Sequence, residues 1–93
     1  MAQWMIGETH FHQKSYELAI EEYLKVEILY DYPQWQAASL LQAGKCYEAI
    51  GRWQQAIDLY QRLIERFPHP EFVDDAKRRL SVARQRAEIA ALP

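Results

Sequence analysis

The sequence of 93 residues contains no asparagine, one cysteine, three glycines and four prolines. The single cysteine, Cys46, excludes an internal disulfide, and we expect it to be a small, partly buried residue rather than a reactive thiol. No run of about 18 apolar residues occurs, so we predict no transmembrane helix. We also predict no signal peptide, because no basic segment leads into an apolar one.

An excess of one charge is also lacking. The chain has 11 Lys and Arg against 13 Asp and Glu, a net charge of -2, which excludes a strongly basic nucleic-acid-binding domain on composition. Lys77, Arg78 and Arg79 form a short basic run, but acidic residues surround it and no aromatic residues alternate with it. We therefore interpret the run as a solvated helix face and expect no nucleic acid as a partner.

The patterns of catalytic sites are missing as well. There is no glycine-rich phosphate loop, no CxxC and no HExxH. Glu8, His10 and His12 are the densest group of possible ligands, but on a helix the two histidines point about 200° apart and cannot chelate one ion. Glu8 and His12 could form a surface pair, and His69, between two prolines, is expected to be a loop residue. We predict no catalytic residue, no metal and no cofactor.

The sequence does contain small and aromatic residues at helical spacing between positions 44 and 68. Gly44 and Tyr47 share one helix face, and Gly51 interrupts the helix. A second amphipathic helix follows, with the steps i, i+3, i+7 and i+10. Its members are Trp53, Ala56, Tyr60 and Leu63, before Pro68. This pattern predicts two packed helices joined by a turn.

The order of these residues resembles the tetratricopeptide repeat (TPR). Leu40, Ala43 and Leu63 depart from the family pattern, but all three are apolar. The resemblance implies an all-α fold in which helix pairs stack into a right-handed superhelix, and it implies protein recognition without catalysis.

Four residues recur at a constant offset of 37 positions. Gly7, Tyr16, Ala19 and Tyr23 precede Gly44, Trp53, Ala56 and Tyr60. We therefore predict a second repeat, with its extra residues in a loop at 30–34 where Pro33 ends the helix. Lys14 stands at the position of Gly51, and Ser15 is expected to cap the next helix through its hydroxyl.

The whole chain is predicted to form one domain of five helices. The expected helices span residues 2–14, 16–30, 35–50, 53–67 and a segment from 71, because Pro68 and Pro70 should exclude helix between them. We divide residues 1–93 into repeat one at about 2–33, repeat two at about 35–68 and a capping helix at about 71–90. The capping helix carries an apolar stripe on one face and charges on the other, as the end of a repeat stack requires.

The TPR resemblance also implies a ligand groove on the first helix of each repeat. Its positions here are Trp4, Glu8 and Phe11, then Leu41, Lys45 and Glu48, and in the capping helix Lys77, Ser81 and Arg84. Chaperone-binding members hold a carboxylate with Lys and Asn, so the lack of Asn argues against that type of site. We expect a peptide or partner helix with an apolar side chain against Trp4, Phe11 and Leu41. The alternative is that these three are buried in the stack.

A different function is also open, namely self-association. About three repeats are usually needed for stability, and the first helix has no helix before it. Met1, Trp4 and Met5 are therefore expected to be exposed and to favour a homodimer or stacking on further repeats.

The turns at 32–35 and 67–72 resemble those of envelope-type TPR domains, in bacterial Tol-associated cell-division coordinators and outer-membrane assembly lipoproteins. This likeness favours the periplasm over the cytoplasm.

Overall fold

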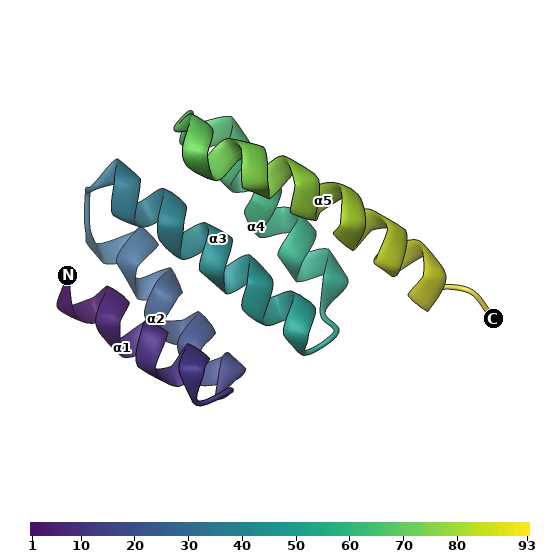
Figure 1. The fold of residues 1–93 in the computed structure, drawn as a ribbon, viewed down its shortest axis with the longest axis horizontal. Helices are drawn as coiled ribbons and strands as arrows, with labels where there is room; N and C mark the ends of the chain where they lie inside the picture. The colour runs from purple at the N-terminus through teal and green to yellow at the C-terminus, as the bar shows by residue number, and fades with distance from the viewer.

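A computed structural model describes all 93 residues, which form five α-helices and no strands (Figure 1). The helices are α1 (Ala2–His12), α2 (Tyr16–Leu29), α3 (Pro33–Ala49), α4 (Trp53–Arg66) and α5 (Pro70–Ala90). The all-α, TPR-like fold expected from the sequence is confirmed.

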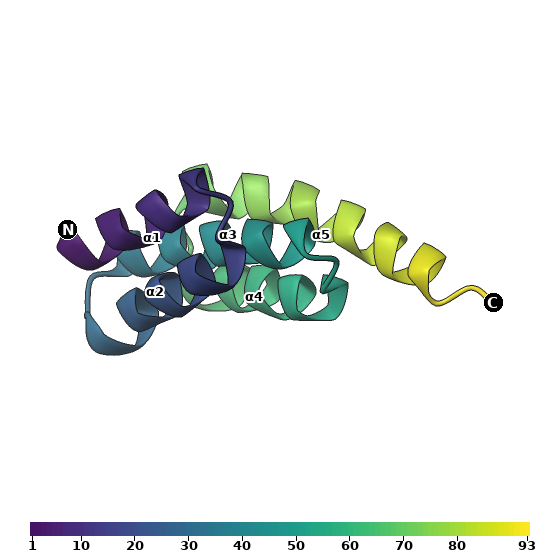
Figure 2. The same cartoon turned by 90° about the horizontal axis from the view of Figure 1, so that it is seen from below.

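The helices lie in two layers. Figure 2 shows α1, α3 and α5 on one side and α2 and α4 on the other. Each helix packs on the next one in the chain, and α3 also touches both α1 and α5, whereas α1 and α5 do not touch each other. We call α1, α3 and α5 the A helices and their side of the molecule the A-helix face. The C-terminal part of α5 projects past the other helices (Figure 1).

Two helices begin at prolines, one or two residues before the starts that the sequence predicted. Pro33 and Pro70 do not stand in loops but begin α3 and α5, because the first turn of a helix needs no N–H from its first residue and proline already has a helical φ. Ser15 does precede α2, but its hydroxyl makes no capping hydrogen bond. Lys14 adopts a left-handed φ of 61°, close to the 77° of Gly51, so both inter-helix turns use the same backbone geometry.

The core of each hairpin depends on a glycine in an A helix facing a tyrosine ring. A Cβ placed on Gly7 would lie 2.8 Å from Cε1 of Tyr23, and one placed on Gly44 would lie 2.7 Å from Cζ of Tyr60. Both tyrosines are fully buried. The 37-residue offset therefore repeats a physical contact, in which the absence of a side chain leaves room for a ring.

The remaining core joins the two hairpins and α5. Ala76, Leu80 and Ala83 of α5 are buried, and Phe72 and Val73 pack against them from the edge. The apolar stripe predicted for this helix is thus confirmed.

One buried charge connects the repeats. The Glu27 side chain at the end of α2 is only 7% exposed, and its carboxylate accepts a hydrogen bond from Arg62 of α4 at 2.8 Å. Arg66 lies 3.8 Å from the same carboxylate. A buried carboxylate is stable only when it is paired and hydrogen-bonded, and Arg62 and Arg66 of α4 provide this pairing for Glu27 of α2.

We expect Gly44→Ala to lower the free energy of unfolding by about 1–2 kcal/mol, because the cost of overpacking exceeds the gain in helix propensity of roughly 1 kcal/mol. Urea denaturation would measure the change. In a Tyr60→Leu background the ring that causes the clash is absent, so the same substitution should cost little. An equal cost in both backgrounds would contradict the glycine–ring contact.

Candidate functional site

The A-helix face is lined by charged groups, and in the first repeat they centre on Glu8. Its carboxylate accepts hydrogen bonds from the Tyr23 hydroxyl and, at 3.0 Å, from Nε2 of Gln42 on α3. Nε2 of His12, one turn further along α1, lies 3.8 Å away, which is the surface pair expected from the sequence. Glu8 thus links α1, α2 and α3.

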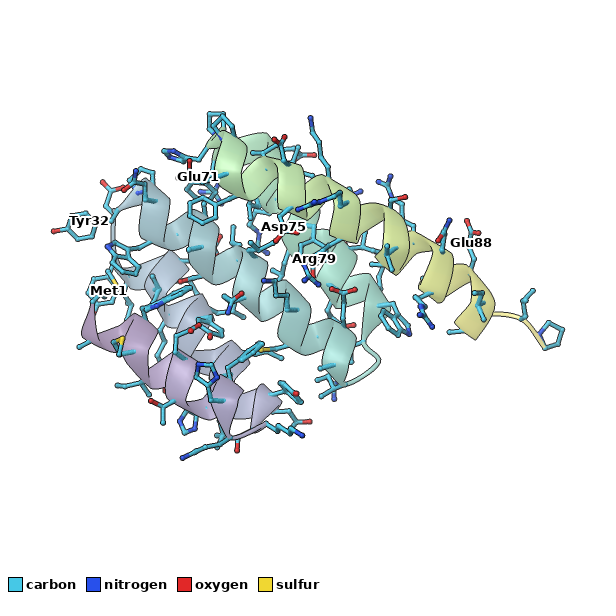
Figure 3. The ribbon with its side chains drawn as sticks, viewed as in Figure 1. Met1, Tyr32, Glu71, Asp75, Arg79 and Glu88 are labelled. Carbon is cyan, nitrogen blue, oxygen red and sulfur yellow. The ribbon has the colours of Figure 1, made fainter.

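The second repeat holds a larger set of charges between α3 and α5. The Glu48 carboxylate accepts a hydrogen bond from the Tyr60 hydroxyl and lies 3.4 Å from a guanidinium nitrogen of Arg79. Nζ of Lys45 lies 3.9 Å from Asp75, and Nε of Arg79 lies 3.5 Å from the same carboxylate. Figure 3 shows Asp75 and Arg79 on the side of α5 that faces α3. These pairs join the two A helices across the face.

Burial shifts the pKa values of Tyr23, Tyr60 and Lys45, which take part in these contacts. Desolvation raises the pKa of the Tyr60 hydroxyl far above its usual value, and the hydrogen bond to Glu48 raises it further. Burial and then Glu8 raise the pKa of Tyr23 in the same way. Both hydroxyls therefore remain protonated donors at any physiological pH. Desolvation, followed by the nearby Arg79, lowers the pKa of the Lys45 ammonium.

The three apolar groove candidates are not equivalent. Leu41 is only 7% exposed and belongs to the core, which agrees with the alternative expectation of burial within the stack and leaves little of its side chain accessible to a ligand. The reason is that α3 is covered on both sides, by the first hairpin and by α4 and α5. Trp4 is partly buried against Tyr23, with ring centroids 5.3 Å apart, and Phe11 packs edge-on against Tyr16.

The predicted groove positions meet different surroundings in each A helix. In α1 and α3 several of them contact the next A helix, as the pairs Glu8–Gln42 and Lys45–Asp75 show. In α5 the corresponding residues are Lys77, Ser81 and Arg84, and all three are exposed. Glu8, Lys45 and Glu48 therefore each have a partner on the next A helix. Lys77, Ser81 and Arg84 of α5 have no such partner.

Sequence reasoning missed the partners on the facing helices. The sequence predicts a solvated face for the charged residues of the last helix, but two of them, Asp75 and Arg79, face α3 (Figure 3). Their spacing of four residues was a usable signal, since i and i+4 lie on one side of a helix. Gln42 carried no comparable signal.

The A-helix face contains no candidate metal site. No three His, Cys, Asp or Glu side chains lie close enough together to hold a metal ion. None of the five helices combines the length and the apolar character needed to cross a bilayer. What the face offers is a set of fixed hydrogen-bonding and charged groups.

Comparison with known families agrees with this geometry. The tetratricopeptide repeat family model matches residues 1–69. The chain belongs to the TPR family. No curated protein and no solved structure matches it. TPR repeats generally mediate protein–protein interaction or scaffolding and are typically non-catalytic.

The buried Cys46 provides a test of the packing on α3. Its side chain is fully buried, and burial, followed by Glu8, raises the pKa of its thiol to about 12. Because only the thiolate reacts, a thiol reagent at pH 8 should modify Cys46 in urea but hardly at all in the folded protein. Labelling followed by mass spectrometry would measure both rates. Equal rates in the two states would contradict the burial of this helix face.

Proposed function

We propose that the A-helix face of this TPR domain binds a peptide or a single helix of a partner protein, in a scaffolding role. The observation that carries the proposal is that Glu8 and Glu48 are each held by a tyrosine hydroxyl from the layer behind. Groups fixed in this way lose little conformational entropy when a ligand binds.

The proposed contact residues follow from their exposure. Lys45 and Glu48 keep 25% and 15% of their side-chain surface accessible, and Lys77, Ser81 and Arg84 are exposed. Trp4 and Phe11 are partly accessible at the edge of α1, so they remain candidates for an apolar contact, whereas Leu41 does not. The likeness of the turns to envelope-type TPR domains extends the proposal to a partner in a bacterial periplasm.

Alanine substitutions on this face test the proposal. A partner isolated with the purified domain should bind Lys45→Ala and Trp4→Ala about 5-fold or more weakly, a loss of roughly 1 kcal/mol. Isothermal titration calorimetry would measure the affinities. Lys25→Ala, on the opposite layer, is the matched control because its ammonium also sits in an ion pair, with Glu22 at 3.2 Å. Unchanged affinity in both A-helix variants would contradict the proposal.

A second candidate is self-association through the outer side of the first hairpin. Several large apolar side chains there are unusually open: Met5 is 59% exposed, Ile6 45%, Leu18 50% and Leu29 66%. Trp4 was expected in this patch, but it packs inward against Tyr23 and Trp35. A second copy would remove these side chains from water.

If this second candidate holds, light scattering across a dilution series should show a dimer that dissociates on dilution. Ile6→Glu should shift the equilibrium to the monomer, because a charge would have to be buried in the contact. Leu92→Glu is the control, since Leu92 is 70% exposed at the other end of the chain. A monomer at every concentration would exclude self-association.

A further inference from the structure

One carboxylate on the A-helix side stands apart from the paired charges. Glu71, in the first turn of α5, is exposed and takes part in no hydrogen bond or ion pair, whereas Asp75, one turn later, is bound to Lys45, Arg78 and Arg79. Figure 3 shows Glu71 at the beginning of α5, next to the first turns of α3.

Glu71 lines a hollow between the beginnings of α3 and α5. The other lining residues are Gln34, Trp35, Ala38 and Phe72. We call this the Trp35 hollow. It contains two aromatic side chains and one free carboxylate, and no Lys or Arg takes part in its lining.

The rings of the hollow are held in place by other rings. Trp35 is 37% exposed, and its ring packs at 56° against Trp4 with centroids 5.6 Å apart. Phe72 packs edge-on with His69 at 6.5 Å. When one side of a large aromatic ring is packed and the other is open, the ring loses little conformational entropy on binding a ligand.

A second hollow continues along the other side of Trp35. It is lined by Tyr32, Pro33, Gln34, Trp35 and His69. Tyr32 is 60% exposed there. The two hollows share Gln34 and Trp35, so a chain of several residues can lie across the indole with one side chain in the Trp35 hollow.

Aromatic rings beside a carboxylate favour a cation. The face of an indole attracts an ammonium or guanidinium group, and a nearby carboxylate adds a charge-assisted hydrogen bond. The positive ends of the α3 and α5 dipoles oppose this attraction. Two features weaken the repulsion between these helix ends and a cation. Pro33 and Pro70 lack an N–H at the helix starts, and the negative charge of Glu71 lies in the first turn of α5.

We propose that the Trp35 hollow binds the arginine or lysine side chain of a partner protein segment. The proposal rests on the proposed function, since it identifies one chemical feature of the partner. The charges at the centre of the A-helix face satisfy one another, so the free carboxylate at its end provides specificity for a basic residue.

A displayed library of random 12-residue peptides, selected on the immobilised domain, tests the proposal. The enriched peptides should share an Arg or Lys at one aligned position. The selected peptide should bind Glu71→Gln about 3- to 30-fold more weakly, because the charge-assisted contact with the carboxylate is lost while the aromatic rings remain. Replacing its arginine with the neutral isostere citrulline should have a similar effect. Glu65→Gln is the control, because Glu65 is an exposed and unpaired glutamate on α4.

Three results would overturn the proposal: no enrichment of basic residues, equal binding of the arginine and citrulline peptides, or equal effects of Glu71→Gln and Glu65→Gln. Trp35→Leu is a second variant, checked for folding by circular dichroism, and it should weaken the peptide as well. Failure here is distinguishable from failure of the proposed function, because the partner-binding experiment with Lys45→Ala does not involve the hollow, whose lining residues do not include Lys45.

Discussion

The structure depends on the approach of a tyrosine ring to a glycine in each helical hairpin. At Gly7 and Gly44 the missing side chain leaves the space that Tyr23 and Tyr60 fill. Because each ring passes beneath the A helix, its hydroxyl reaches a carboxylate on the A-helix face. One packing constraint therefore sets both the distance between the layers and the position of polar groups on the surface.

The two hairpins use this constraint with different surface residues. Glu8 and Lys45 occupy equivalent positions, 37 residues apart, yet Tyr23 bonds to Glu8 whereas Tyr60 bonds to Glu48, one turn later. Lys45 is thereby free to pair with Asp75, and Glu48 with Arg79. The repeat keeps its core and varies its surface, as expected when the core encodes the fold and the surface encodes the partner.

In the proposed binding mode, the paired charges also limit which ligands the A-helix face can recognise. A ligand must compete with the Lys45–Asp75 and Glu48–Arg79 contacts if it binds at the centre. Groups without such partners lie at the edges: Glu71 at the start of α5, and Lys77 and Arg84 on its exposed side. This distribution favours a ligand whose charges meet the edges and whose middle is neutral or apolar.

The fold could be predicted from the sequence because the residues that pack between helices recur in it at regular spacing. The recurrence of Gly7 and Tyr23 at Gly44 and Tyr60 is local and regular, and the structure confirms that it reports a contact. α3 and α5 begin one or two residues before the expected positions, because Pro33 and Pro70 suit the first position of a helix. The partners of Lys45 and Glu48 were missed because they lie on another helix. Pairing of side chains between two helices depends on the rotation and tilt of each helix, which a single sequence does not specify.

Chemical-shift mapping of the labelled domain with its bound partner tests the central claim most directly. The account predicts that the amide signals that move on binding belong to α1, α3 and α5, with Lys45 and its neighbours among them. Shifts confined to α2 and α4 would contradict it, because the surface fixed by the two tyrosines would then play no part in recognition.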